Sequence, residues 1–209
     1  ANILGYVCLV FVPLWIAMYF MWNEKIVVDG ANDDLTGCFM SIAVLKALKD
    51  QNVNLENTEV GVLITGSEEA GLRGATAFTK RHKGENKDVE TYIIAFDTMR
   101  DYDYMTIYHR DMTGMVKNSP EVVALLDEAC NDPDVNHPLP HGVVPFGASD
   151  AAAFSRGGFK AAAVAGQNPK YAPYYHNRRD TPDQMIPETF ALGLDIALAA
   201  IEAFDRDQK

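Results

Sequence analysis

Residues 66–74 read Gly-Ser-Glu-Glu-Ala-Gly-Leu-Arg-Gly, and only Thr65 separates them from the apolar run Val-Gly-Val-Leu-Ile at positions 60–64. The apolar run predicts a buried strand, so Glu68 and Glu69 are expected at its carboxyl end. Two adjacent carboxylates are costly in such a place unless a cation lies beside them. A divalent metal accounts for both, because one carboxylate can bind the ion while the other moves protons on a water that the metal activates.

Acidic residues also follow the other predicted strands. Asp33 lies beyond the short apolar stretch 26–28, Asp97 follows the apolar run 92–96, and His176 lies in a late polar loop. Ligands bind at the carboxyl ends of the strands in open α/β sheets, so we expect these side chains to converge. Several oxygen ligands and one imidazole suit zinc or a similar divalent ion.

Strands and helices alternate along the chain, which favours a sheet covered on both faces. We therefore expect an α/β fold, a three-layer sandwich whose central mixed, mostly parallel sheet is covered by helices. Strands are expected at 60–64, 92–96 and 161–165, and a short strand or an extended lead-in at 26–28. Helices are expected at 35–49, 70–80, 120–130, 151–154 and 187–204. The segment 131–147, rich in Pro, Asn, His and Gly, is expected to be a long loop.

Composition restricts the class of protein. The chain has 209 residues, enough for one domain with a full hydrophobic core, and a formal net charge of -11. This charge argues against nucleic acid as a partner, because phosphate binding needs patches of Lys and Arg. The three cysteines form no CxxC motif and indicate no disulfide framework.

The N-terminal residues 3–22 carry no charged side chain. That length matches a membrane-spanning helix, which needs about 20 apolar residues. No basic stretch precedes the run and no small-residue cleavage site follows it, which argues against a signal peptide. We favour a membrane-spanning segment at 1–24 followed by a catalytic domain at 25–209, hence a membrane-associated protein of undetermined sidedness. A buried core helix or strand pair stays open as the alternative.

The ordered motifs resemble the co-catalytic zinc aminopeptidases, whose fold includes the glutaminyl cyclases. The resemblance runs from about Val27 to the C-terminus, and the order of the motifs makes it specific. The motifs are Gly-Ala-Asn-Asp-Asp-Leu-Thr-Gly at 30–37, Glu-Glu-Ala-Gly-Leu at 68–72, Asp97, Ser149-Asp150, and Tyr175-His176 with Asp180-Thr181. This resemblance implies a zinc-dependent exopeptidase that removes N-terminal residues from peptides.

The resemblance also implies a role for each residue. Asp33 would bridge two zinc ions, with Glu69 and His176 completing the first site and Asp97 binding the second ion. Glu68 would be the general base, and Tyr175 would donate a hydrogen bond to the tetrahedral oxyanion. Three further residues would support the ligands or the substrate loop without binding metal: Asp180, Ser149 and Asp150. The last two also suit a helix start, where Ser caps and Asp favours the dipole.

One part of the family pattern is missing. The family has a His-x-Asp motif upstream of the bridging Asp, whereas residues 1–30 contain no His. One zinc site is therefore complete, and the other has only Asp33 and Asp97. We favour an N-terminally incomplete member, in which this piece alone is poorly active. Two alternatives stay open: a single-zinc aminoacyltransferase like the glutaminyl cyclases, or a catalytically degenerate binding ectodomain of the same fold.

Overall fold

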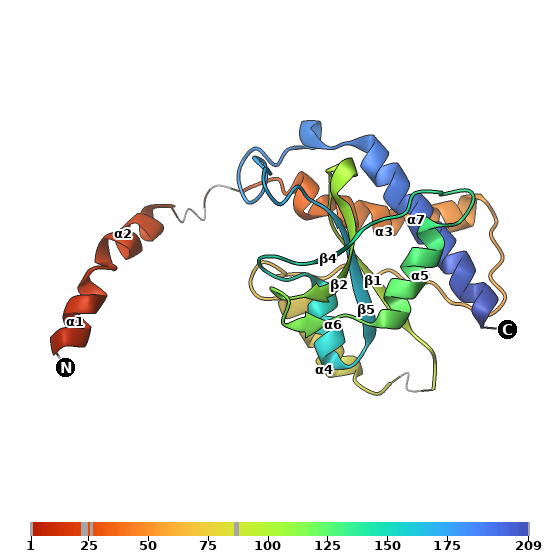
Figure 1. Cartoon of the computed structure of the whole chain (residues 1–209), viewed down its shortest axis with the longest axis horizontal. Helices are drawn as coiled ribbons and strands as arrows, with labels where there is room; N and C mark the ends of the chain where they lie inside the picture. The colour runs from red at the N-terminus through yellow and green to blue at the C-terminus, as the bar shows by residue number, and fades with distance from the viewer. Residues whose placement is uncertain (1, 22–24, 26, 86–87, 209) are drawn as a thin grey trace.

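The computed structural model of the chain describes residues 2–21, 25, 27–85 and 88–208. Its centre is a five-stranded sheet with the order β1-β5-β2-β3, and β4 pairs with β2 beside this path (Figure 1). The strands are β1 (Tyr92–Met99), β2 (Met105–Asp111), β3 (Val116–Lys117), β4 (His141–Val143) and β5 (Lys160–Gly166).

The sheet is mixed, as the sequence predicts, but it is not mostly parallel. β1 pairs with β5 and β2 with β4 in parallel, whereas β2 pairs antiparallel with both β5 and β3. The sheet is less parallel than expected because the chain reverses direction after β1, at a turn that the hydrophobic periodicity of the sequence did not predict. A short 3-10 turn, Tyr102–Tyr104, follows β1 and sends β2 back in the opposite direction to β5.

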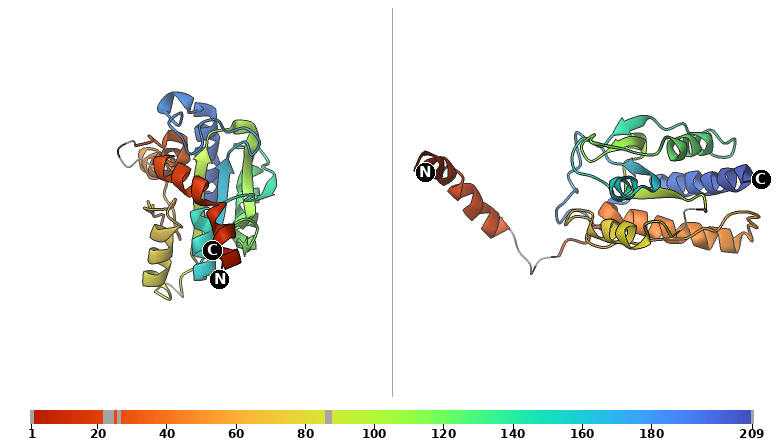
Figure 2. Two further views of the ribbon diagram at one scale, coloured as in Figure 1. Left: turned by 90° about the vertical axis from the view of Figure 1, so that its left-hand side faces the viewer. Right: turned by 90° about the horizontal axis from the view of Figure 1, so that it is seen from below.

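Helices cover both faces of the sheet, which confirms the three layers (Figure 2). The helices are α3 (Thr36–Asp50), α5 (Pro120–Cys130) and α7 (Pro187–Asp207) on one face, and α4 (Arg73–His82) and α6 (Asp150–Gly157) on the other. Along β5, Ala162 and Val164 join the core beneath α3, α5 and α7, while Ala161 and Ala163 join the core beneath α4 and α6. This alternation is the period of two that a strand imposes on its side chains.

The N-terminal segment does not form the single spanning helix that we expected. It forms two short helices, α1 (Asn2–Leu9) and α2 (Val12–Met21), which lie apart from the sheet in Figure 1. Within the described parts of the chain, no helix is both long enough and apolar enough to cross a bilayer. The prediction of a transmembrane helix is therefore unsupported.

The expected strand at 60–64 is also absent from the described residues. This segment is extended between the end of α3 and the Glu pair, yet Leu63 and Ile64 are 47% and 54% exposed. A strand requires a neighbour for its ladder of hydrogen bonds, and no backbone hydrogen bond connects residues 58–65 to another described segment. Val27 and Val28 are likewise outside any strand, and Ile26, the first residue of that expected strand, lies outside the described residues.

Candidate metal centre

Asp33 is held in place by a buried carboxylate from the other end of the chain. The loop 30–35 precedes α3, and Asp180, only 1% exposed, reaches it from the connection between β5 and α7. Its Oδ1 accepts from the backbone N of Asn32 at 2.8 Å and from Asn32 Nδ2 at 2.7 Å, and its Oδ2 accepts from the backbone N of Asp33 at 3.0 Å. The backbone that carries Asp33 is thus held at two consecutive amide groups, those of Asn32 and Asp33.

Asp34 fixes the same loop to the sheet, a role that the sequence analysis did not assign. Its Oδ1 accepts from the backbone N of Gly37 at 3.0 Å and of Thr98 at 3.1 Å, so it joins the start of α3 to the end of β1. A Cβ at Gly37 would lie 2.3 Å from the carbonyl oxygen of Phe96, so only glycine permits this approach. The sequence does contain one indication of this role: Asp34 lies three residues before Gly37, whose backbone N–H is in the first turn of α3, and acidic side chains commonly accept from such amides.

The Glu pair lies in a tight turn before α4. The turn is closed by hydrogen bonds from Leu72 N to Glu68 O at 2.7 Å and from Gly74 N to Gly66 O at 2.9 Å. A Cβ at Gly74 would lie 2.5 Å from Gly66 O, which explains the glycine at the second end of the motif. Glu69 leaves this turn 62% exposed at its side chain, towards the loop of His176.

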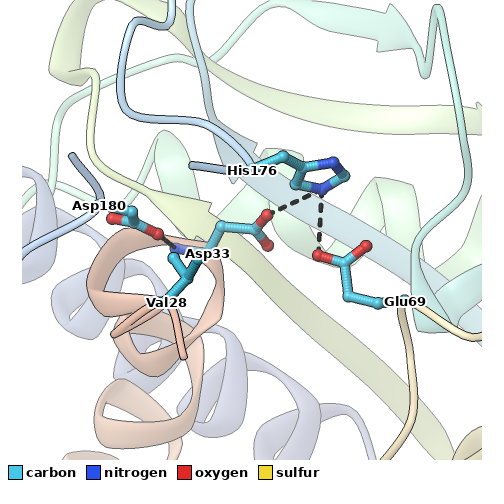
Figure 3. A pocket seen from close by; sticks show the side chains of 6 residues that line it. Val28, Asp33, Glu69, His176 and Asp180 are labelled. Atoms are coloured by element: carbon cyan, nitrogen blue, oxygen red, sulfur yellow. Dashed lines mark hydrogen bonds and ion pairs between the residues drawn. The ribbon is translucent and has the colours of Figure 1, made fainter. Parts of the chain in front are cut away.

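Three of the predicted residues meet in one cleft of about 400 Å³ (Figure 3). The Nε2 atom of His176 lies 3.2 Å from Asp33 Oδ2 and 3.0 Å from Glu69 Oε1. One ligand atom from each residue can be chosen so that all three lie within 4.8 Å of one another. Donors bound to one tetrahedral zinc at about 2.0–2.2 Å would lie about 3.3–3.6 Å apart. The residues therefore fit a metal ion.

The electrostatics of the cleft also fit a cation. Burial and then the neighbouring charge of Asp97 raise the pKa of Asp33 to about 8. The same two causes, in the same order, raise the pKa of Glu68 to about 8. Burial, with smaller contributions from Asp111, Asp150 and Glu69, raises the pKa of Asp97 to about 6. Carboxyl groups crowded in this way repel one another as anions, and a divalent cation would relieve that repulsion.

Asp97 lies near the three donors but outside their group. It follows Phe96 within β1, and its Oδ1 accepts a hydrogen bond from Thr98 Oγ1 at 2.9 Å. Its negative charge raises the pKa of both Asp33 and Glu68, so Asp97 lies within electrostatic reach of both carboxyl groups. A role for Asp97 in holding a second ion stays a prediction.

Ser149 and Asp150 occupy the start of α6. The hydroxyl of Ser149 accepts from Ala151 N at 3.2 Å and donates to the buried Asp111 at 2.6 Å, so Ser149 caps the helix as expected. Asp150 lies closer to the cleft. One of its oxygens accepts from Thr65 Oγ1, the other is buried without a hydrogen-bond partner among the described residues, and its charge raises the pKa of Glu68.

Tyr175 lies against the imidazole of the cleft. Its ring stacks on His176 with centroids 3.8 Å apart. Burial, followed by the charge of Asp33, raises the pKa of the Tyr175 hydroxyl, so this group keeps its proton and can donate a hydrogen bond. His176 itself has φ of 55°, a left-handed conformation that is uncommon outside glycine, so the surrounding loop must hold it there.

The remaining histidines have other partners within the described part of the chain. His82 contacts Glu85 and the ring of Phe78, and His137 contacts Tyr102. His141 pairs with Asp127 and lies near His109. None of these four histidines belongs to the group of donors found among the described residues.

The carboxylates and the imidazole gathered in one cleft of this α/β sandwich are ligand types that metal-dependent hydrolases use. The sequence matches peptidase family M28 over residues 18–201, so the chain belongs to that family. The members of this family are classed as peptidases. A comparison with curated proteins finds no match to this sequence.

Solved structures share the fold. An aminopeptidase from Aneurinibacillus sp. strain AM-1 matches 86% of this chain with a TM-score of 0.68 and 24% identity. A zinc aminopeptidase from Bacillus subtilis matches 83% with a TM-score of 0.68 and 19% identity, and a glutaminyl cyclase from an Acidobacteriales bacterium matches 85% with a TM-score of 0.61 and 17% identity. This chain spans 40%, 42% and 63% of the length of those three chains, respectively.

Proposed function

We propose that the chain is the catalytic part of a zinc-dependent aminopeptidase that hydrolyses N-terminal residues from peptides. The observation that carries this proposal is the meeting of Asp33, Glu69 and His176 with a second carboxylate, Glu68, beside them. Membership of a peptidase family supports the reaction class, and a similar structure that is a zinc aminopeptidase supports the metal. A second ion, held between Asp33 and Asp97, belongs to this proposal.

Zinc, when bound, would supply a Lewis acid that lowers the pKa of water and polarises the scissile carbonyl. Asp33, Glu69 and His176 would hold it. Glu68 accepts the proton of the attacking water and delivers it to the leaving amine, because its carboxyl group is not one of those three donors and burial raises its pKa to about 8, closer to that of the groups with which it exchanges the proton. Tyr175 donates a hydrogen bond to the oxyanion, for which its raised pKa keeps the hydroxyl protonated.

Substitution Glu68→Gln tests the assignment of the base. We expect turnover of an aminoacyl-nitroanilide to fall at least about 100-fold, since general bases contribute about 10²–10⁴-fold. Zinc content, measured by elemental analysis, should stay at the wild-type level because Glu68 is not one of the three donors. Glu59→Gln, which changes an exposed carboxyl on the preceding segment, is the matched control. Normal hydrolysis by Glu68→Gln would refute the role.

A single-ion aminoacyltransferase is the second candidate. It is favoured by the one group of three donors found in the described residues and by the glutaminyl cyclases among the similar structures. The products separate the two functions. A peptide that begins with glutamine would yield free glutamine in the first case, and ammonia with a pyroglutamyl peptide in the second. A chain that takes up no zinc would instead indicate a binding ectodomain.

Membrane association through residues 3–22 also belongs to the proposal. It is supported by the absence of charge in this run and by the exposure of its aromatic side chains. Trp15, Tyr19 and Phe20 are 63%, 78% and 78% exposed.

A further inference from the structure

One pair of charged residues contacts the connection between β5 and α7 at several points along its length. Arg100 and Asp101 directly follow β1, and their side chains form an ion pair that is only 20% and 11% exposed. The connection 167–186 carries His176 and Asp180, the residues that supply and support the cleft. It contains one short 3-10 turn, Pro182–Gln184, and otherwise no regular helix or strand. Something outside it must therefore hold its shape.

The pair contacts this connection at its start, middle and end. Near the start, Asp101 Oδ2 accepts from the backbone N of Asn168 at 2.8 Å. In the middle, the same oxygen accepts from the hydroxyl of Tyr174 at 3.1 Å, and the Arg100 guanidinium lies 4.5 Å from the centroid of the Tyr174 ring. Near the end, Arg100 Nε donates to the carbonyl of Gln184 at 2.8 Å.

Tyr174 is the central contact of this arrangement. Its side chain is 1% exposed, the largest of the fully buried side chains among the described residues. A buried hydroxyl needs a partner, and Asp101 supplies it with a charged acceptor. The ring also receives the cation of Arg100 on its face. Tyr174 is therefore fixed by packing, by a hydrogen bond and by a cation–π contact.

The turn that follows Tyr174 connects it by hydrogen bonds to the segment that carries His176 and Asp180. The carbonyl of Tyr174 accepts from the backbone N of Asn177 at 3.3 Å, and the carbonyl of Asn177 accepts from the backbone N of Asp180 at 3.0 Å. The side chain of Asn177 donates to the carbonyls of Pro173 at 2.9 Å and Tyr175 at 3.0 Å. His176, in its left-handed conformation, lies between the residues that these hydrogen bonds connect.

We propose that Arg100, Asp101 and Tyr174 form a clamp that positions His176 as a metal ligand and Asp180 as the support of Asp33. The clamp residues touch neither the donors nor the cleft in any described contact, so they act through the loop. Partners behind a ligand set its orientation and usually change metal affinity by about 10–100-fold when they are removed. This inference rests on the proposed metal centre.

Tyr174→Phe tests the clamp with the smallest change, because it removes one hydroxyl and keeps the ring under Arg100. We expect zinc to bind about 10-fold more weakly in a competition assay with a chromophoric chelator. The visible spectrum of the cobalt-substituted protein should also change, since it reports the arrangement of the ligands. Tyr102→Phe is the matched control, because its hydroxyl lies 3.4 Å from His137 and contacts no residue of the connection. That variant should bind zinc within twofold of wild type.

Hydrogen exchange in the metal-free protein tests the same clamp without zinc. We expect the amides of Asn177 and Asp180 to exchange about 10-fold faster in Tyr174→Phe than in Tyr102→Phe, because local opening governs their protection. Asp101→Asn should act in the same direction if it folds. Wild-type zinc affinity, cobalt spectrum and amide exchange in Tyr174→Phe would overturn the clamp, even if its Tm fell. A wild-type chain that binds no zinc would instead overturn the metal centre on which the clamp acts.

Discussion

Asp180 illustrates how much a single buried carboxylate contributes to the cleft. It accepts from two backbone amides and one side-chain amide, all within the loop of Asp33, across more than 140 residues of sequence. A carboxylate offers only acceptors, so it satisfies three donors that converge on it. An amide of the same shape would place a donor against one of those donors.

We therefore predict that Asp180→Asn destabilises the fold and weakens zinc binding together. A buried donor left unpaired costs about 1–3 kcal/mol, and each kcal/mol lowers the Tm by about 2–4 °C in a chain of this size. Calorimetry and chelator competition would measure the two effects. Asp183→Asn, an exposed acid in the same connection, is the control and should change neither. An unchanged Tm in Asp180→Asn would show that the loop does not depend on this carboxylate.

The residues of the cleft were easier to predict than the residues that hold them. Asp33, Glu69 and His176 each follow an apolar run or belong to a motif whose order along the chain is informative. The bond between Tyr174 and Asp101 spans 73 residues and leaves no local pattern, because Tyr and Asp are ordinary residues of loops. Sequence motifs therefore could not predict interactions of this kind, which form only in the folded chain.

At the scale of elements, the sequence predicted the helices better than the strands. The expected strand at 60–64 is not formed, Val27 and Val28 lie outside any strand, and β2, β3 and β4 were not predicted. The helix expected at 120–130 is α5 with the same bounds, since Pro120 starts it at a position where the missing amide costs nothing. The apolar run 60–64 has the composition of a strand but no ladder. In the described part of the chain, only the residues that flank the run have hydrogen-bond partners: Asn57 donates its backbone N–H to Asp205 at 2.8 Å, and Thr65 donates its hydroxyl to Asp150. Composition sets the preference for a strand, whereas pairing requires a neighbour that composition does not identify.

The two N-terminal helices carry a prediction at the same scale. α1 and α2 expose apolar and aromatic side chains along most of their described length, and such a surface favours a lipid interface. We expect the chain to float with vesicles of phosphatidylcholine in a density gradient. Trp15→Glu combined with Phe20→Glu should release it, while Phe146→Glu, which changes an 87% exposed side chain in the catalytic domain, should not. Equal flotation of all three proteins would contradict the proposed membrane contact.

At the scale of the whole molecule, the fold gathers acidic groups from distant segments into one place. Asp33 precedes α3, Glu68 and Glu69 precede α4, Asp97 is in β1, and Asp150 begins α6. In a chain with a net charge of -11, this convergence raises the energy of the folded state whenever the carboxyl groups are ionised. Metal and protons are then alternative ways to relieve the same repulsion.

The stability of the metal-free protein should accordingly fall as the pH rises. The pKa of Asp33 is about 8 in the folded chain against an ordinary value of 3.8, and that of Glu68 is about 8 against 4.5. At a pH between the ordinary pKa and the folded pKa of each group, the folded state holds a proton that the unfolded state has released. The free energy of unfolding therefore decreases as the pH rises through this interval. We expect a lower Tm at pH 8 than at pH 5 in the presence of a chelator.

Two comparisons isolate the cause of that pH dependence. Asp33→Asn removes one of the titrating groups, so its Tm should vary less between pH 5 and pH 8 than that of the wild-type chain. Saturating zinc should act in the opposite sense, because the ion binds the deprotonated carboxylates and its contribution to stability grows as they ionise. The stabilisation by zinc should therefore be larger at pH 8 than at pH 5. A metal-free Tm that rises across this interval, in parallel for wild type and Asp33→Asn, would show that the crowded carboxyl groups do not control the stability of the fold.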